Sequence, residues 1–133
     1  MLNQRAAASY GSVMVETGVD SSDRVQLIHM LLDGLLESLS AAECHIKAND
    51  IQEKSRHLNR AGRIVLGLQG SLDYEKGGEL AYNLSELYGY VTRMLLQINL
   101  KNDLALLREV KGLMTDIRDA WETVPSLLPA KCA

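Results

Sequence analysis

The sequence predicts an all-α protein, an antiparallel up-down four-helix bundle, and three observations support this prediction. Apolar residues recur in alternating steps of three and four over four segments, which is the spacing of one helix face. Both prolines, Pro125 and Pro129, lie beyond the last segment, so the strongest helix breaker is absent from all four. Only a few residues join segments of about 20 residues, which makes consecutive helices antiparallel neighbours.

The first two helices are expected at about residues 22–48 and 51–72. The apolar stripe of the first contains Val25, Ile28, Leu32, Leu35, Leu39, Ala42 and Ile46. The stripe of the second contains Ile51, Leu58, Ala61, Val65, Leu68 and Leu72. Asn49 and Asp50 suit the end of one helix and the cap of the next. The segment "DYEKGG" (73–78) ends the second helix, because paired glycines favour turns.

The other two helices are expected at about residues 78–100 and 103–124. The stripe of the third contains Leu80, Leu84, Leu87, Val91, Met94, Leu95 and Ile98. The stripe of the fourth contains Leu106, Val110, Leu113, Ile117, Ala120 and Val124, and it is broadened by Leu107, Met114 and Trp121. The segment "NLKND" (99–103) is a turn in which Asn102 or Asp103 caps the fourth helix. An irregular or short-helical N-terminal arm (1–20) precedes the bundle (21–124), and a flexible tail (125–133) follows it.

Composition narrows the classes of protein. The net charge of −3 argues against nucleic-acid binding, which needs a concentrated basic face. We find no signal peptide and no apolar run long enough for a membrane span. The two cysteines, Cys44 and Cys132, do not make a disulfide framework in a chain of 133 residues, so we expect reduced thiols and a cytoplasmic protein, with a cross-link between them as the alternative.

The outer faces of the first and third helices are unusually apolar. Opposite its stripe, the fourth helix carries Arg108, Lys111, Thr115, Asp119 and Glu122. A projection at 100° per residue gives the first helix an outer face of Leu27, Met30, Gly34, Ala41, His45 and Ala48, with Leu31 and Ser38 at its edge. The third helix shows Tyr82, Gly89, Arg93, Leu96 and Leu100. We therefore expect two apolar faces that the bundle interior does not cover.

Large uncovered apolar surfaces usually mark a partner site, and two explanations stay open here. A foreign protein binds these faces, or the chain covers them itself, through residues 1–20 or through a homodimer. Arg56, Arg60 and Arg63 share an outer face of the second helix. They either steer an acidic partner or form an ordinary solvated surface.

The residues that would support catalysis or metal binding are missing. No glutamate is followed by histidine three residues later, as di-iron bundles require. His29, His45 and His57 lack companions at ligand spacing, and Glu53 with His57 fits a surface pair, so no metal and no cofactor are expected. Neighbouring Cys44 and His45 point 100° apart on a helix and cannot act as nucleophile and base. A phosphorelay histidine at His45 lacks a glycine to make room for the phosphoryl group. We expect no enzyme.

Several longer motifs resemble a known family. They are "LIHMLLDG" (27–34), "NDIQEK" (49–54), "SLDYEKGGELAYNLSELYGYVTRMLLQINLKND" (71–103) and "DAWETV" (119–124). Together they are similar to the flagellar export chaperones of the FliS type, over about residues 10–124. Two apolar exchanges depart from the family pattern: Leu32 replaces an aromatic residue, and Ile98 replaces an alanine.

The resemblance implies a cytoplasmic chaperone that binds the disordered C-terminal segment of flagellin, prevents early polymerisation and delivers it to the flagellar type III export apparatus. It also implies an arm that moves when flagellin binds, with Tyr10 as the gating residue. The expected flagellin-binding residues are Leu27, Met30, Leu31 and Gly34 in the first helix, and Tyr82, Tyr90, Leu96 and Leu100 in the third. Export-gate components and an anti-sigma factor are further candidate partners. The alternative is a structural or assembly protein that homodimerises through the same faces.

Overall fold

The computed structural model describes residues 21–123 and gives side-chain positions from Arg24 onward. Four helices make up this part of the chain: α2 (Ser21–Lys47), α3 (Ile51–Gly70), α4 (Tyr74–Lys101) and α5 (Leu104–Glu122). No strand occurs among these residues. The all-α fold class is confirmed. The predicted arm with Tyr10 and the predicted tail lie outside the described residues.

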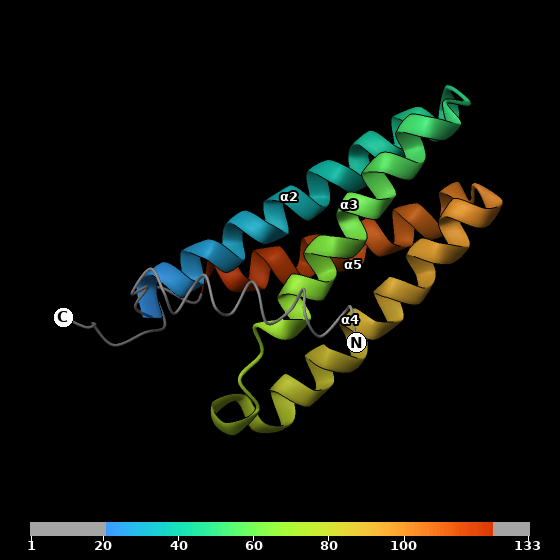
Figure 1. Ribbon diagram of the computed structural model, residues 1–133. Coiled ribbons are helices and arrows are strands. Elements are labelled where there is room, and N and C mark those ends of the chain that lie inside the picture. Colours follow the sequence, from blue (N-terminus) through green and yellow to red (C-terminus); the bar gives the residue numbers. More distant parts are fainter. Residues whose placement is uncertain (1–20, 124–133) are drawn as a thin grey trace.

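The helices form a ring in which each packs against two others (Figure 1). Helix α2 packs against α3 and α5, and α4 packs against the same two helices. Helices α2 and α4 are therefore diagonal across the bundle. The core between the four helices is made mostly of the predicted stripes, and its fully buried members include Leu32, Leu35, Leu39, Val65, Val91, Leu107, Val110 and Met114. The expectation is wrong for Ile51 and Leu80, which are 71% and 65% exposed near the N-terminal ends of their helices, and for Ala120, which is exposed near the end of α5.

The turns follow from the residues that cap the helices. Asn49 adopts a left-handed conformation (φ 57°) after α2, and the Asp50 side chain accepts a hydrogen bond from the amide of Glu53 to cap α3. In the turn between α4 and α5, Asn102 is left-handed (φ 54°) and Asp103 accepts a hydrogen bond from the amide of Leu106 at 3.0 Å. Side-chain caps of this kind satisfy amides that have no partner inside the helix.

Helix α4 begins four residues earlier than predicted. Asp73 accepts hydrogen bonds from the amides of Glu75 and Lys76, both at 3.0 Å, and this cap supports one helical turn before the glycines. Gly78 then interrupts the helix with φ 50° and ψ −127°. Gly77 is required by space, because a Cβ there would lie 2.9 Å from that of Ala81. The predicted glycine break is thus a kink inside α4.

Among residues 21–123, no helix is both long and apolar enough to cross a membrane.

Candidate peptide-binding surface

Most of the exposed large apolar side chains in the described part of the chain lie on α4. Tyr82 is 63% exposed, Leu96 69% and Leu100 79%. At 100° per residue these three positions fall within about 40° of one another. They extend over about 27 Å of the helix axis. The prediction that this face stays uncovered within the bundle is confirmed.

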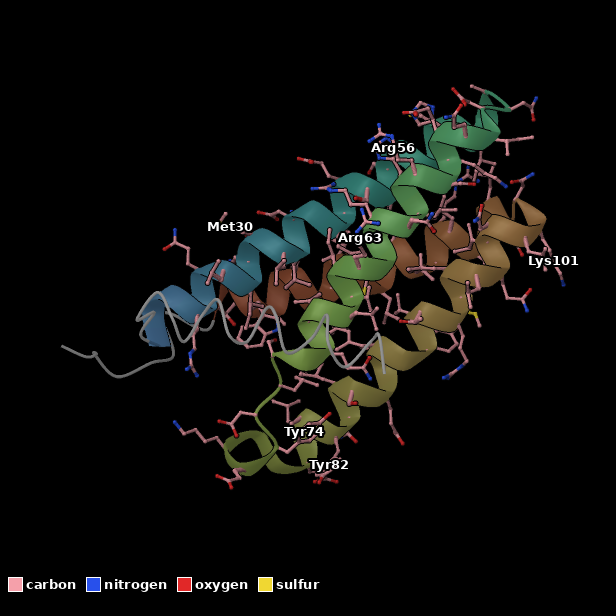
Figure 2. All side chains as sticks on the ribbon, in the orientation of Figure 1. Met30, Arg56, Arg63, Tyr74, Tyr82 and Lys101 are labelled. Atoms are coloured by element: carbon pink, nitrogen blue, oxygen red, sulfur yellow. The ribbon has the colours of Figure 1, made fainter. Side chains whose placement is uncertain are left out.

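The kink in α4 adds an aromatic pair to one end of this face. Tyr74, from the turn before Gly78, lies against Tyr82 with ring centroids 4.7 Å apart and planes tilted by 48°. Figure 2 shows both side chains at the same end of α4, away from α2. Because Tyr74 is also exposed, the pair offers two ring faces to a partner.

A groove runs between α3 and α4 beside the outer face of α4. It has a volume of about 340 Å³ and is lined by Leu58, Asn59, Gly62, Arg63, Leu66, Thr92, Leu95, Leu96 and Asn99. Leu96 therefore belongs to both the groove and the exposed face. A Cβ on Gly62 would meet no atom within 4 Å, so nothing in the bundle's packing requires glycine there. The missing side chain widens the groove.

A buried lysine holds the two walls of this groove together at one end. Lys54 of α3 is only 6% exposed, and its Nζ donates to the backbone oxygen of Asn99 at 2.7 Å and to the side chain of Asn102. Ser55 donates to the Asn99 side chain at 3.3 Å. A cation at the C-terminal end of α4 also interacts favourably with the helix dipole. These contacts fix the spacing of α3 and α4.

The predicted basic face of the second helix is divided in the structure. Arg56 is paired with Glu53, with 2.8 Å between Nη2 and Oε1. Arg60 turns toward α2, where it donates to the Ser38 hydroxyl at 2.7 Å and to the Gly34 carbonyl at 3.3 Å. Arg63 is exposed at the groove and makes no ion pair with any described residue. All three side chains are at least partly exposed on α3, but Arg56 and Arg60 have partners, so Arg63 is the arginine of this set that remains available to an acidic partner.

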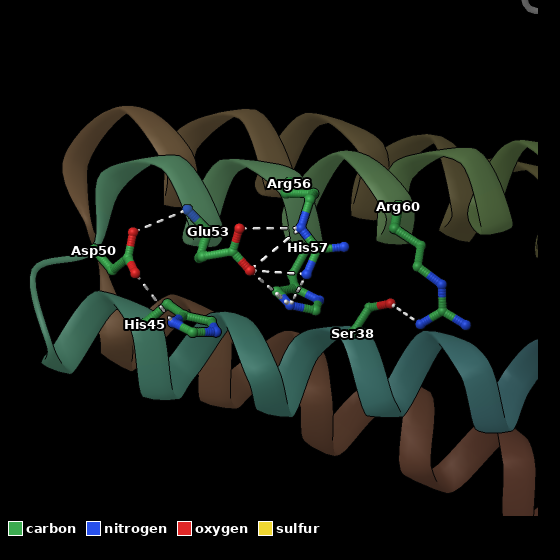
Figure 3. Close-up of polar contacts among 7 residues, drawn as sticks. All are labelled: Ser38, His45, Asp50, Glu53, Arg56, His57 and Arg60. Carbon is green, nitrogen blue, oxygen red and sulfur yellow. Dashed lines mark hydrogen bonds and ion pairs between the residues drawn. The ribbon is translucent and has the colours of Figure 1, made fainter.

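The outer face predicted for the first helix is an interface. A Cβ on Gly34 would lie 3.4 Å from Nη2 of Arg60 and 3.5 Å from Cδ1 of Ile64. Ser38 is fully buried and bound by Arg60 (Figure 3). The expectation that the bundle leaves this face open is therefore wrong at Gly34 and Ser38, whereas Met30 of the same face stays exposed. A helical projection shows which face of a helix is apolar, but it does not show which neighbouring helix packs on that face. Here α3 packs on it.

The predicted residues of the first helix thus have different surroundings. Leu31 packs against the core as a half-buried side chain, and Leu27 is half-buried. Met30 alone of the four is largely exposed, at 63%, and it projects from α2 on the side away from α4 (Figure 2). Because α3 and α5 separate α2 from α4, these two sets of residues do not meet in one groove.

Tyr90 lies on another side of α4 from the exposed face. It is half-buried, and its hydroxyl donates to Oε2 of Glu109 in α5 at 3.1 Å. This hydrogen bond, with burial, raises the pKa of Tyr90. Its place next to α5 separates it from the α3–α4 groove.

A second hollow of about 330 Å³ opens at the end of the bundle where α2 begins. Its apolar lining includes Val25, Ile28, Leu68, Leu72, Leu80, Leu84 and Trp121. Beside it, His29 contacts the backbone oxygen of Trp121 through Nε2 at 2.7 Å. His29 thus joins α2 to α5, in agreement with a half-buried imidazole that packs within the bundle.

These features define a class of protein. The described residues form an all-α bundle with an uncovered apolar α4 face and a groove beside it, which are features that helical bundles use to bind an amphipathic segment.

Comparison with known proteins gives the family. The profile of the family described as "Flagellar protein FliS" matches residues 6–127. The flagellar secretion chaperone FliS of Salmonella typhimurium is 44% identical over 117 residues, 87% of each chain. FliS of Escherichia coli is 41% identical over 92% of this chain and 90% of its own. FliSB of Pseudomonas aeruginosa is 36% identical over 93% and 98%. This chain belongs to the FliS family of flagellar secretion chaperones, whose role is not enzymatic.

Proposed function

We propose that this chain acts in the cytoplasm, where it binds the disordered C-terminal segment of flagellin, prevents premature polymerisation and delivers flagellin to the flagellar type III export apparatus. Membership of the family supports the chaperone role. The observation that carries the choice of client is the α4 face, since Tyr82, Leu96 and Leu100 remain exposed together. An unfolded segment that forms an amphipathic helix can bury such a face.

A preformed surface suits a client that must order itself. Coupled folding and binding uses several kcal/mol of the interaction energy to order the peptide. The bundle already holds α3 and α4 at a fixed spacing through Lys54 and Asn99. Little further ordering is needed on the chaperone side, so more of the apolar contact contributes to affinity.

Polar groups that line the groove fix the orientation of the bound client peptide. Arg63 and Asn59 lie on the α3 wall, and Thr92 and Asn99 lie on the α4 wall. The unpaired guanidinium of Arg63 can bind an acidic side chain of the client through two hydrogen bonds. The leucines provide affinity, and these polar groups select the register of the bound peptide.

Most of the residues that we propose to contact the client lie on α4. Tyr82, Leu96 and Leu100 form its centre, and Met30 is a candidate for a separate contact made by a longer client. Leu31, Gly34 and Tyr90 contribute indirectly, since they pack against neighbouring helices, and Leu27 is half-buried on the diagonal helix α2. Release occurs when components of the export apparatus compete for the same surface.

The test is calorimetric titration with about 40 C-terminal residues of the cognate flagellin, a length that can bury the roughly 1,000–3,000 Å² typical of coupled folding and binding. We expect saturable 1:1 binding with a negative heat-capacity change. Gly62→Leu fills the groove and should weaken binding at least ~10-fold. Gly112→Leu is the matched control, because Gly112 lies on α5 and a Cβ there also meets nothing within 4 Å.

The homodimer alternative gives a different result in the same samples. Sedimentation analysis would then find a stable dimer whose population is unchanged by the peptide. Peptide binding that Gly62→Leu and Gly112→Leu leave equally strong would place the client outside the α3–α4 groove.

A further inference from the structure

The turn between α2 and α3 brings together three potential metal ligands from two helices. They are His45 at the end of α2, and Glu53 and His57 in the first two turns of α3. One ligand atom from each residue lies within 4.8 Å of the other two. The two imidazole rings are stacked, with centroids 5.3 Å apart and planes 8° from parallel. Figure 3 shows the three side chains converging between the helices.

We propose that His45, Glu53 and His57 form a binding site for a divalent transition-metal ion of the Zn²⁺ class. Two imidazole nitrogens and one carboxylate are a ligand set that binds Zn²⁺ with open positions for water. Imidazole favours Zn²⁺, Ni²⁺ and Cu²⁺ over Mg²⁺ and Ca²⁺, which prefer oxygen ligands. The sequence pattern does not reveal this site, because His45 and the other two ligands lie on different helices.

The ligands can close around an ion with small side-chain movements. Zinc–nitrogen distances of about 2.0–2.1 Å place tetrahedral ligand atoms about 3.4 Å apart. The separations between the ligand atoms, which are at most 4.8 Å, must therefore shorten by up to about 1.4 Å. Rotation about χ2 of histidine is soft, and it also turns the stacked rings so that their nitrogens converge. The His45 side chain is 31% exposed and that of Glu53 34%, so both have room to move.

The electrostatics of the cluster favour a cation once Arg56 moves away. Arg56 donates to Glu53, so this pair has to open before the carboxylate can bind an ion. The Arg56 side chain is 63% exposed, and exposed ion pairs are weak. Asp50 lies 3.9 Å from Nδ1 of His45 and adds negative charge beside the site.

The state of His57 also fits metal binding. Its Nε2 lies 3.3 Å from Nη2 of Arg56, and because a guanidinium only donates, this contact requires a lone pair on Nε2. The same nitrogen lies 3.9 Å from Oε1 of Glu53. The other ring nitrogen, Nδ1, is buried and has no hydrogen-bond partner among the described residues. Nε2 of His57 therefore lies beside both Arg56 and Glu53, and it can face an ion next to Glu53 once Arg56 moves away.

The experiment is a ZnCl₂ titration of the full chain, free of any histidine tag, followed by calorimetry. All samples carry Cys44→Ser and Cys132→Ser, because Cys44 is an exposed free thiol next to His45. We expect one saturable site per chain and a thermal midpoint that rises with Zn²⁺ and returns with EDTA. His57→Gln and Glu53→Gln should each weaken binding by more than the roughly 10–100-fold seen when only an outer-shell partner is lost.

His29→Gln is the matched control, since His29 is the one remaining histidine of the chain. It lies outside the cluster and contacts the backbone oxygen of Trp121 instead. Its zinc affinity should equal that of the parent protein. Circular dichroism of Glu53→Gln checks that loss of binding is not loss of fold, because this carboxylate is on the surface. The proposal is overturned if no saturable binding is found, or if His57→Gln and Glu53→Gln bind zinc as tightly as the parent.

Discussion

The α3-facing side of α2 and the outer side of α4 have similar compositions but opposite surroundings. Each contains a glycine among apolar residues, Gly34 in α2 and Gly89 in α4. A Cβ on Gly34 would meet side chains of α3, Arg60 and Ile64. A Cβ on Gly89 would meet only Arg93 of its own helix, at 3.6 Å. Glycine in an apolar helix face therefore indicates a close contact in one case and an open surface in the other.

The difference follows from the residues that α3 presents to each side. Toward α2 it presents Arg60, whose guanidinium reaches a buried hydroxyl and a backbone carbonyl. Toward α4 it presents Gly62 and Leu58, which leave a groove. Helix α3 thus packs closely against α2 but leaves a groove beside α4. A partner can bind next to α4 without breaking the bundle.

The largest expected effect is the loss of peptide binding when charges are placed on the exposed face of α4. Leu96→Asp combined with Leu100→Asp should abolish flagellin-peptide binding, because each change places a charge in an apolar contact and central contact residues contribute about 2 kcal/mol or more. Titration calorimetry measures the loss. Since both side chains are more than two-thirds exposed, circular dichroism should show unchanged helicity.

Met30→Asp on α2 is the control for this pair, because Met30 is similarly exposed but lies on the diagonal helix. Its effect on peptide affinity should be much smaller. Equal losses for Met30→Asp and the α4 double variant would mean that the client contacts both helices, and unchanged affinity of the double variant would remove α4 from the site.

Periodicity is sufficient to predict the four helices but not their surroundings. Residues such as Leu35, Val65, Val91 and Val110 were placed in the core by spacing alone, and all are fully buried. Ser38 could not be predicted as buried, because its partner Arg60 is 22 residues away in another helix. Lys54 is buried for the same kind of reason, through its contact with Asn99. Contacts between helices depend on which helices become neighbours, and periodicity does not contain that information.

The start of α4 shows the same limit on a local scale. The glycine pair was correctly identified as a break, but the Asp73 cap supports a helical turn before it. That turn brings Tyr74 onto Tyr82. A residue pattern identified the interruption, whereas the extent of the helix depended on a side-chain hydrogen bond and on the fit of Gly77 against Ala81.

The next largest expected effect is on the pH dependence of stability, and it tests the buried side of α4. Tyr88 is 2% exposed, and burial raises its pKa to about 12. Above pH 10 the unfolded chain ionises this phenol, while the folded chain keeps it protonated until about pH 12. Stability should therefore fall as pH rises from 10 to 12, by roughly 3 kcal/mol for a shift of about two pKa units.

Urea unfolding at several pH values measures this loss, and Tyr88→Phe should show correspondingly less of it. Tyr82→Phe, on the open face of the same helix, serves as the control and should follow the wild-type curve. An identical pH dependence for Tyr88→Phe and the wild type would mean that solvent reaches the inner side of α4 as well as the outer side.

The smallest expected effect is a change in the free energy of unfolding, and it tests whether α3 packs closely against α2 at Gly34. Gly34→Leu must displace the Arg60 guanidinium and Ile64, and overpacking of this kind typically costs about 1–3 kcal/mol. Leucine also gains up to about 1 kcal/mol of helix propensity over glycine, so a net loss of about 1–2 kcal/mol is expected in urea unfolding. Gly112→Leu on α5 meets open space and should be neutral or stabilising. If Gly34→Leu proves as stable as Gly112→Leu, the α2 face is as open as that of α4, and the two helices are equivalent candidates for the client.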